Sequence, residues 1–192
     1  MNFSHFSSRK VLEIEKIIIH ERYGMRMEND IALLKLKEKV DLSIYTPACL
    51  APKGANYTGK TGSVYGWGRE KYFDPSCIKF KPEPPGNPVL KHTTIRIESN
   101  DKCEESSGTY PCCDARGKEQ LCNASMANSI TEDMLCGYNL GTDACQGDSG
   151  GPFTVEVDGK HTLVGVVSWG HGCGQVSVPQ VWINTNSIII DL

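Results

Sequence analysis

Short apolar runs of strand length, separated by turns, constrain this 192-residue chain more than any other feature. Residues 11–19 form a β-branched run, and residues 92–97 alternate with a period of two, as in a half-buried strand. Residues 153–157 and 162–169 flank Asp158-Gly159, a dipeptide typical of a tight β-hairpin turn. The sequence contains no long amphipathic helix, so we expect an all-β barrel or sandwich.

Two polar stretches interrupt the strand pattern and are expected to be long surface loops. Residues 72–88 contain five prolines, too many for a regular element because proline has no backbone N–H to donate. Residues 104–131 are polar and carry three cysteines, so we expect disulfides rather than an apolar core to hold them.

The nine cysteines point to an oxidising compartment, where disulfides persist, and so to a secreted protein. Three glycosylation sequons, beginning at Asn2, Asn56 and Asn123, agree with that location. The cysteines of residues 103–122 have no histidine nearby at ligand spacing, which favours a disulfide framework over a zinc site. Because nine is odd, at least one cysteine is free or pairs outside the chain.

The overall composition is that of a globular protein, with 39% hydrophobic and 22% charged residues. A formal net charge of −3 gives no support for nucleic acid or an anionic membrane as a partner. No apolar run approaches the roughly 18 residues of a membrane span, and residues 1–10 lack the apolar core of a signal peptide. Secreted chemistry without a secretion signal leads us to expect missing upstream sequence.

The sharpest chemical signal is the string Asp-Ala-Cys-Gln-Gly-Asp-Ser-Gly-Gly-Pro at residues 143–152. A nucleophilic serine needs backbone N–H groups aimed at the oxyanion that forms when it attacks a carbonyl. Glycines on both sides of Ser149 allow a tight turn and the close approach of a substrate backbone. The string is followed by Ser168-Trp169-Gly170, which makes the pattern far more specific than a lone Gly-Asp-Ser-Gly.

This ordered set resembles the chymotrypsin/trypsin family of serine proteases. Residues 29–34 resemble the segment that carries the aspartate of the catalytic triad, and further matches lie at residues 66–68 and 134–136. The resemblance implies an all-β, chymotrypsin-like double β-barrel. Residues 1–60 would be the C-terminal part of the first barrel with the linker, and residues 61–192 an intact second barrel.

The resemblance also assigns the catalytic roles. It makes Ser149 the nucleophile, with the N–H groups of Gly147 and Ser149 forming the oxyanion hole. Asp30 would orient the histidine base and stabilise its imidazolium form. Asp148 would pair with the new N-terminal ammonium that zymogen cleavage creates. Protein or peptide substrates are implied, and neither a metal nor an organic cofactor.

The substrate pocket implied by the resemblance has one departure from the family pattern. Asp143 stands where trypsin-like members hold the carboxylate that binds Arg or Lys, and residues 168–170 resemble the substrate-binding strand. Gln180, however, stands where the family usually has a glycine lining the same pocket. Its amide can hydrogen-bond to Asp143 and fill space meant for substrate. We therefore expect cleavage after Arg or Lys, with Gln180 reducing the space available to such a side chain.

The catalytic histidine is missing. Family members carry it before the aspartate, in an Ala-Ala-His-Cys-like stretch, and none precedes Asp30 here. His5 and His20 are read as surface residues, and the other histidines lie beyond Asp30, out of order for the base. The activation site is absent too. We therefore expect a fragment of a secreted endopeptidase that is inactive alone; the alternative is a non-catalytic homologue that binds or regulates partners.

The resemblance also suggests how some of the cysteines pair. Cys103 would bond to Cys136, and Cys145 to Cys173. Cys49 resembles the cysteine that tethers an upstream propeptide or light chain, which would account for the odd count. The other four cysteines allow three pairings; because a bond between neighbours is strained, Cys77 is expected to reach one of the adjacent pair at 112–113 and Cys122 the other.

Overall fold

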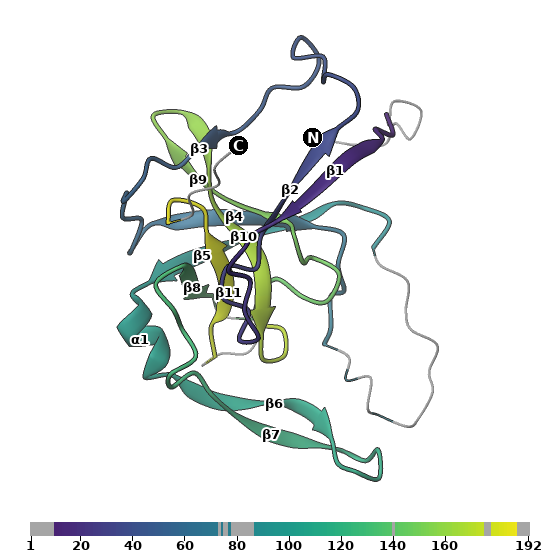
Figure 1. Ribbon diagram of the computed structural model, residues 1–192. Coiled ribbons are helices and arrows are strands. Elements are labelled where there is room, and N and C mark those ends of the chain that lie inside the picture. The colour runs from purple at the N-terminus through teal and green to yellow at the C-terminus, as the bar shows by residue number, and fades with distance from the viewer. Residues whose placement is uncertain are drawn as a thin grey trace.

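The computed structural model describes residues 10–72, 74, 77, 87–139, 141–174 and 178–187. Within these residues the chain is almost entirely β-structure, with one short helix, α1 (Asn100–Glu104) (Figure 1). The strands are β1 (Ile14–Ile19), β2 (Ala32–Leu36), β3 (Cys49–Leu50), β4 (Thr61–Gly66), β5 (Lys91–Glu98), β6 (Ser107–Cys113), β7 (Glu119–Ser125), β8 (Met134–Tyr138), β9 (Pro152–Val157), β10 (Lys160–Gly170) and β11 (Gln180–Asn184).

Six of these strands close into a barrel. Their order is β11-β8-β5-β4-β9-β10, and β10 pairs antiparallel with β11 to complete the ring. Closure leaves no free edge between these strands, and β3 adds to the ring by pairing parallel with β10. The all-β, chymotrypsin-like fold expected from the sequence is confirmed. All six barrel strands lie between Thr61 and Asn184, within the residues expected to form the second barrel.

The barrel is filled by the inward side chains of the alternating strands. On β5, Ile95 and Ile97 are buried, and the Phe153 and Trp182 rings meet with their centroids 4.7 Å apart. Gly165 leaves the room for this pair, because a side chain there would come within 2.9 Å of Trp182 Cβ. Period-two patterning therefore gives each strand its inner face, and close packing fixes how those faces fit.

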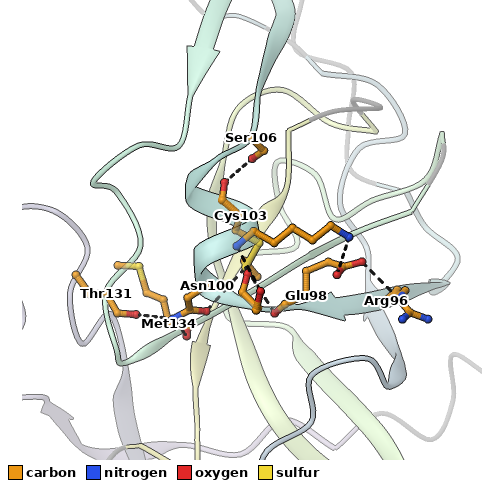
Figure 2. The surroundings of a disulfide bond; sticks show 10 residues. Arg96, Glu98, Asn100, Cys103, Ser106, Thr131 and Met134 are labelled. Atoms are coloured by element: carbon orange, nitrogen blue, oxygen red, sulfur yellow. Dashed lines mark hydrogen bonds and ion pairs between the residues drawn. A yellow bond between two sulfur atoms is a disulfide. The ribbon is translucent and has the colours of Figure 1, made fainter.

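A buried disulfide holds α1 against the barrel. Cys103 on α1 bonds to Cys136 on β8, and both residues are buried. Beside it, the Asn100 side chain donates to the carbonyls of Thr131 and Met134, at 3.2 and 3.3 Å (Figure 2). These contacts fix the start of the segment that leads into β6.

The segment at residues 104–131 contains regular structure that the sequence analysis missed. Strands β6 and β7 pair along their whole length and form a hairpin that lies along one side of the barrel (Figure 1). The Cys112–Cys122 disulfide joins the two strands, and Cys77–Cys113 links the hairpin to the segment after β4. The expected loop is therefore a β-hairpin, although disulfides do hold it as predicted.

Strands β1 and β2 form a separate two-stranded sheet beside the barrel (Figure 1). Large apolar side chains on it are exposed, including Ile17 at 58% and its cross-strand partner Leu34 at 55%. The loop between the strands is anchored to the barrel, since the Asn29 N–H donates to Asp133 Oδ2 at 2.6 Å. Exposed apolar surface of this kind favours association between protein molecules, so we predict poor solubility.

Among the described residues, no helix is long and apolar enough to cross a membrane.

Candidate active site

Ser149 lies in a tight loop that leads into β9. Two turns shape this loop: the Asp148 N–H donates to the Cys145 carbonyl, and the Gly151 N–H donates to the Asp148 carbonyl. Gly147 has φ 93°, a conformation that favours glycine. Ser149 itself is exposed, so its hydroxyl faces solvent rather than the core.

The two backbone N–H groups expected to form an oxyanion hole are available. Within the described part of the chain, neither the Gly147 N–H nor the Ser149 N–H donates a hydrogen bond. The neighbouring Gly150 N–H, by contrast, donates to the Val167 carbonyl on β10 at 2.9 Å, which holds the loop on the barrel. The loop therefore combines a fixed backbone with two free donors next to an exposed hydroxyl.

The Asp148 side chain is held by backbone N–H groups. Its Oδ1 accepts a hydrogen bond from the Gly68 N–H at 2.7 Å, and its Oδ2 accepts one from the Cys145 N–H at 2.9 Å. A side chain at Gly66 would collide with this carboxylate, so the Gly66-Trp67-Gly68 sequence lets the backbone approach it. A cavity of about 330 Å³ lies beside Asp148, and Thr142 contributes to its lining.

Asp30 meets strand β10 across a long sequence separation. Its Oδ2 accepts a hydrogen bond of 2.7 Å from the Ser168 hydroxyl on β10. Ile31, the next residue, packs partly buried against the apolar cluster that includes Val181 and Ile183. The loop between β1 and β2 therefore carries the Asp30 carboxylate to β10.

No histidine ring in the described residues hydrogen-bonds to Asp30 or Ser149. His20 Nδ1 accepts from the Arg22 N–H at 3.2 Å, and the His92 ring stacks on Tyr65. His161 is exposed on β10, and His171 packs against rings after that strand. His5 lies outside the described residues.

The Asp143 carboxylate is partly buried at one end of this region. Its oxygens accept hydrogen bonds from the Ala144 N–H at 2.8 Å and the Gly174 N–H at 3.2 Å. Burial raises the pKa of Asp143 to about 7, although the hydrogen bonds from Gly174, Ala144 and Gln180 oppose the rise.

Gln180 is buried opposite Gly170, its partner in the antiparallel register of β10 and β11. Its amide donates to the Gly172 carbonyl at 3.0 Å and also hydrogen-bonds to Asp143. The Cys145–Cys173 disulfide joins the two segments on either side of this amide.

An aromatic cluster at the end of β10 was not foreseen from the sequence. The Tyr110 ring on β6 lies 5.5 Å from the His171 ring, which in turn lies 6.0 Å from Trp169. Burial lowers the pKa of His171. Local sequence gives no signal for this contact, because the hairpin is folded back onto a segment far along the chain.

One group of potential metal ligands lies among the described residues: Asp74, Cys77 and Cys113. The two sulfurs are joined in a disulfide and offer no thiolate, so this group does not fit a metal ion.

Comparisons with known proteins agree with the fold. The family model described as Trypsin matches residues 2–189, so the chain belongs to the trypsin family of serine proteases. It is 30% identical over 190 residues to the complement C1s subcomponent of Sus scrofa, covering 91% of this chain and 25% of that protein. It is 32% identical over 175 residues to the vitamin K-dependent protein C of Oryctolagus cuniculus, covering 86% of this chain and 33% of that protein. The serine proteinase stubble of Drosophila melanogaster is also 32% identical over 175 residues, covering 88% of this chain and 19% of that protein. The chain thus spans a third or less of the length of these relatives.

Proposed function

We propose that this chain supplies the nucleophile, the oxyanion hole and the triad aspartate of a secreted serine endopeptidase. The observation that carries the proposal is the exposed Ser149 beside the two free N–H groups of Gly147 and Ser149. In the proposed reaction, Ser149 Oγ attacks the carbonyl carbon of the scissile peptide bond. The two N–H groups stabilise the oxyanion, the amine leaves, and water then hydrolyses the acyl-enzyme.

The proton of Ser149 needs a base, and we propose that this base is a histidine outside these 192 residues. Asp30 would accept the second N–H of that imidazole while it is held by Ser168. The chain alone would then have no useful peptidase activity. Deleting the base of another serine protease costs on the order of 10⁶ in rate.

Asp148 is proposed to pair with the α-ammonium of a new N-terminus. The support is the cavity of about 330 Å³ beside it and the two N–H groups that already hold its carboxylate. An ammonium entering that cavity would gain a charge-assisted hydrogen bond and lock the Ser149 loop.

The substrates are proposed to be proteins or peptides, and the residue preferred before the cleaved bond depends on whether Gln180 leaves the Asp143 carboxylate accessible. Cys49 is exposed and unpaired, which supports a disulfide to an upstream propeptide or light chain. Asn56 and Asn123 are both exposed at their sequons, which supports a secreted glycoprotein.

The second candidate is a non-catalytic homologue that binds or regulates a partner. One observation favours it: within the described residues, no histidine ring hydrogen-bonds to Asp30 or Ser149. The trypsin fold without its base retains the loops and pockets that recognise proteins.

The test joins residues 10–192 to a histidine-bearing first-barrel segment from a trypsin-family relative. We expect the chimera to hydrolyse a mixed peptide library and its Ser149→Ala variant to be inactive. The 192-residue chain is expected to show no turnover. Rapid turnover by the chain alone, lost in Ser149→Ala, would disprove the need for an outside histidine. A cooperatively melting chimera without turnover would favour the binding role.

A further inference from the structure

We infer that Gln180 closes the base of the substrate pocket, so that the pocket selects short uncharged side chains and excludes Arg and Lys. The inference rests on the proposed function, because it concerns the substrate side chain beside the cleaved bond. It makes Gln180 the specificity-determining residue and Asp143 its internal partner.

The first support is where the Gln180 side chain lies. Gln180 and Gly170 face each other across β10 and β11, and a side chain at Gly170 would collide with the carboxamide of Gln180. The amide therefore lies over the backbone of Gly170, in space left by the missing side chain. Gln180 is only 6% exposed, so this amide belongs to the packed interior rather than to a mobile surface.

The second support is that the amide is held in place. Its nitrogen donates to the Gly172 carbonyl at 3.0 Å, and the side chain also hydrogen-bonds to Asp143. Displacing it would leave buried donors and acceptors unsatisfied, which is costly. A substrate side chain has to overcome that cost before it reaches the carboxylate.

The third support is that groups within the protein already hydrogen-bond to the carboxylate of Asp143. The Ala144 and Gly174 N–H groups and the Gln180 amide all hydrogen-bond to it. Burial also raises its pKa to about 7, so this carboxyl group gives up its proton less readily than a solvated one. A cation entering the pocket thus finds a weaker negative charge than a solvated carboxylate would offer.

The position of the cavity beside Asp143 also supports the inference about Gln180. The cavity that Asp143 lines is the one that also contains Asp148. Neither Gly170 nor Gln180 lines that cavity. The accessible side of Asp143 is therefore the Asp148 side, and Gln180 covers the side facing β10.

The first test uses the purified 192-residue chain and needs no catalysis. The probe is p-aminobenzamidine, an aryl amidine that mimics the arginine head group and whose fluorescence rises on leaving water. We expect no binding by the natural chain at millimolar probe and at least 10-fold tighter binding by Gln180→Gly. Gln180→Ala is a second opening variant in case glycine weakens β11, and adding Asp143→Asn to either opening variant should abolish binding.

Equal binding by the natural chain and both opening variants would overturn the inference. So would an absence of binding by two opening variants that melt cooperatively.

The second test separates this inference from the proposed function. In the histidine-bearing chimera, a peptide library varied before the cleaved bond should show cleavage after short uncharged residues. Gln180→Gly should raise cleavage after Arg and Lys at least 10-fold. Efficient cleavage after Arg with Gln180 in place would overturn the inference and leave the protease proposal standing. No cleavage of any peptide by either chimera would overturn the protease proposal itself.

Discussion

The carboxylate of Asp30 accepts a 2.7 Å hydrogen bond from the hydroxyl of Ser168, across 138 residues of sequence. Asp30 follows β1 in the small separate sheet, whereas Ser168 lies on β10 of the closed barrel. The bond therefore connects the two parts of the structure at Asp30, which we propose as the triad aspartate.

Removing either partner of this bond should destabilise the fold and the two effects should not add. We expect Asp30→Ala and Ser168→Ala each to lower the free energy of unfolding by about 1–2 kcal/mol, because a charged acceptor strengthens the bond. The double variant should lose less than the sum, with a coupling of about 1 kcal/mol in urea titrations.

The matched control for this cycle is the exposed pair Asp41 and Ser43, whose side chains hydrogen-bond at 2.6 Å. Substitution of that pair should show no measurable coupling, since water competes for both groups. Additive effects at Asp30 and Ser168 would mean that the bond contributes nothing to holding the two parts together.

Asp143 should make stability depend on pH. Its pKa rises from the ordinary 3.8 to about 7 in the folded protein because of burial, so the folded state binds this proton more tightly than the unfolded state does. Its contribution to stability is then full below about pH 4 and is lost as pH rises through about 7. Asp143→Asn should flatten the curve over that range, by at most on the order of 4 kcal/mol.

The measurement is the free energy of unfolding in urea at pH 4.5, 6 and 8 for the natural chain and Asp143→Asn. A constant difference between the two across these pH values would show that Asp143 ionises as freely in the folded state as in the unfolded one.

The two disulfides near the hairpin should differ in their contribution to stability. Cys103–Cys136 is buried and closes a separation of 33 residues, whereas Cys112–Cys122 closes 10. Replacing the first pair by alanine should cost about 3–5 kcal/mol, from chain entropy and lost packing. The second replacement should cost about 2 kcal/mol and serves as the matched control, with both costs read from urea unfolding.

Equal costs for the two pairs would contradict this reasoning. They would mean that the short Cys112–Cys122 loop constrains the unfolded chain as strongly as the longer one.

The oxidised protein should carry one reactive thiol, on Cys49. All eight other cysteines are paired in disulfides, and Cys49 is exposed. Titration with Ellman's reagent without denaturant should release one equivalent of thiolate, and none from Cys49→Ser. A reading of one equivalent in Cys49→Ser would place the free thiol elsewhere and require a different pairing of the cysteines.

Much of the fold and the site could be predicted from local sequence. Residues 92–97 show the period of two that β5 uses to bury Ile95 and Ile97. The motif at 143–152 predicted a turn, and two of its glycines, Gly147 and Gly150, adopt the positive φ that such a turn needs.

Polar composition misled the interpretation of residues 104–131. Disulfides and strand pairing stabilise much of the β6–β7 hairpin, and few of its residues, such as Ala124 and Tyr110, pack into an apolar cluster, so its hydrophobic pattern is weak. The ring of Tyr110 on β6 contacts the ring of His171, which follows β10. This contact depends on how the hairpin folds back toward that part of the chain.

The sequence by itself determined the strand-forming segments, the family, and the turn that carries Ser149, because side-chain periodicity and turn-forming glycines act within a few residues. Only the tertiary structure decided that Asp30 meets Ser168, and that the amide of Gln180 fills the space over Gly170. Both contacts depend on strand register and barrel closure, which bring distant residues together through packing. Local sequence patterns do not show which residues from distant parts of the chain will meet.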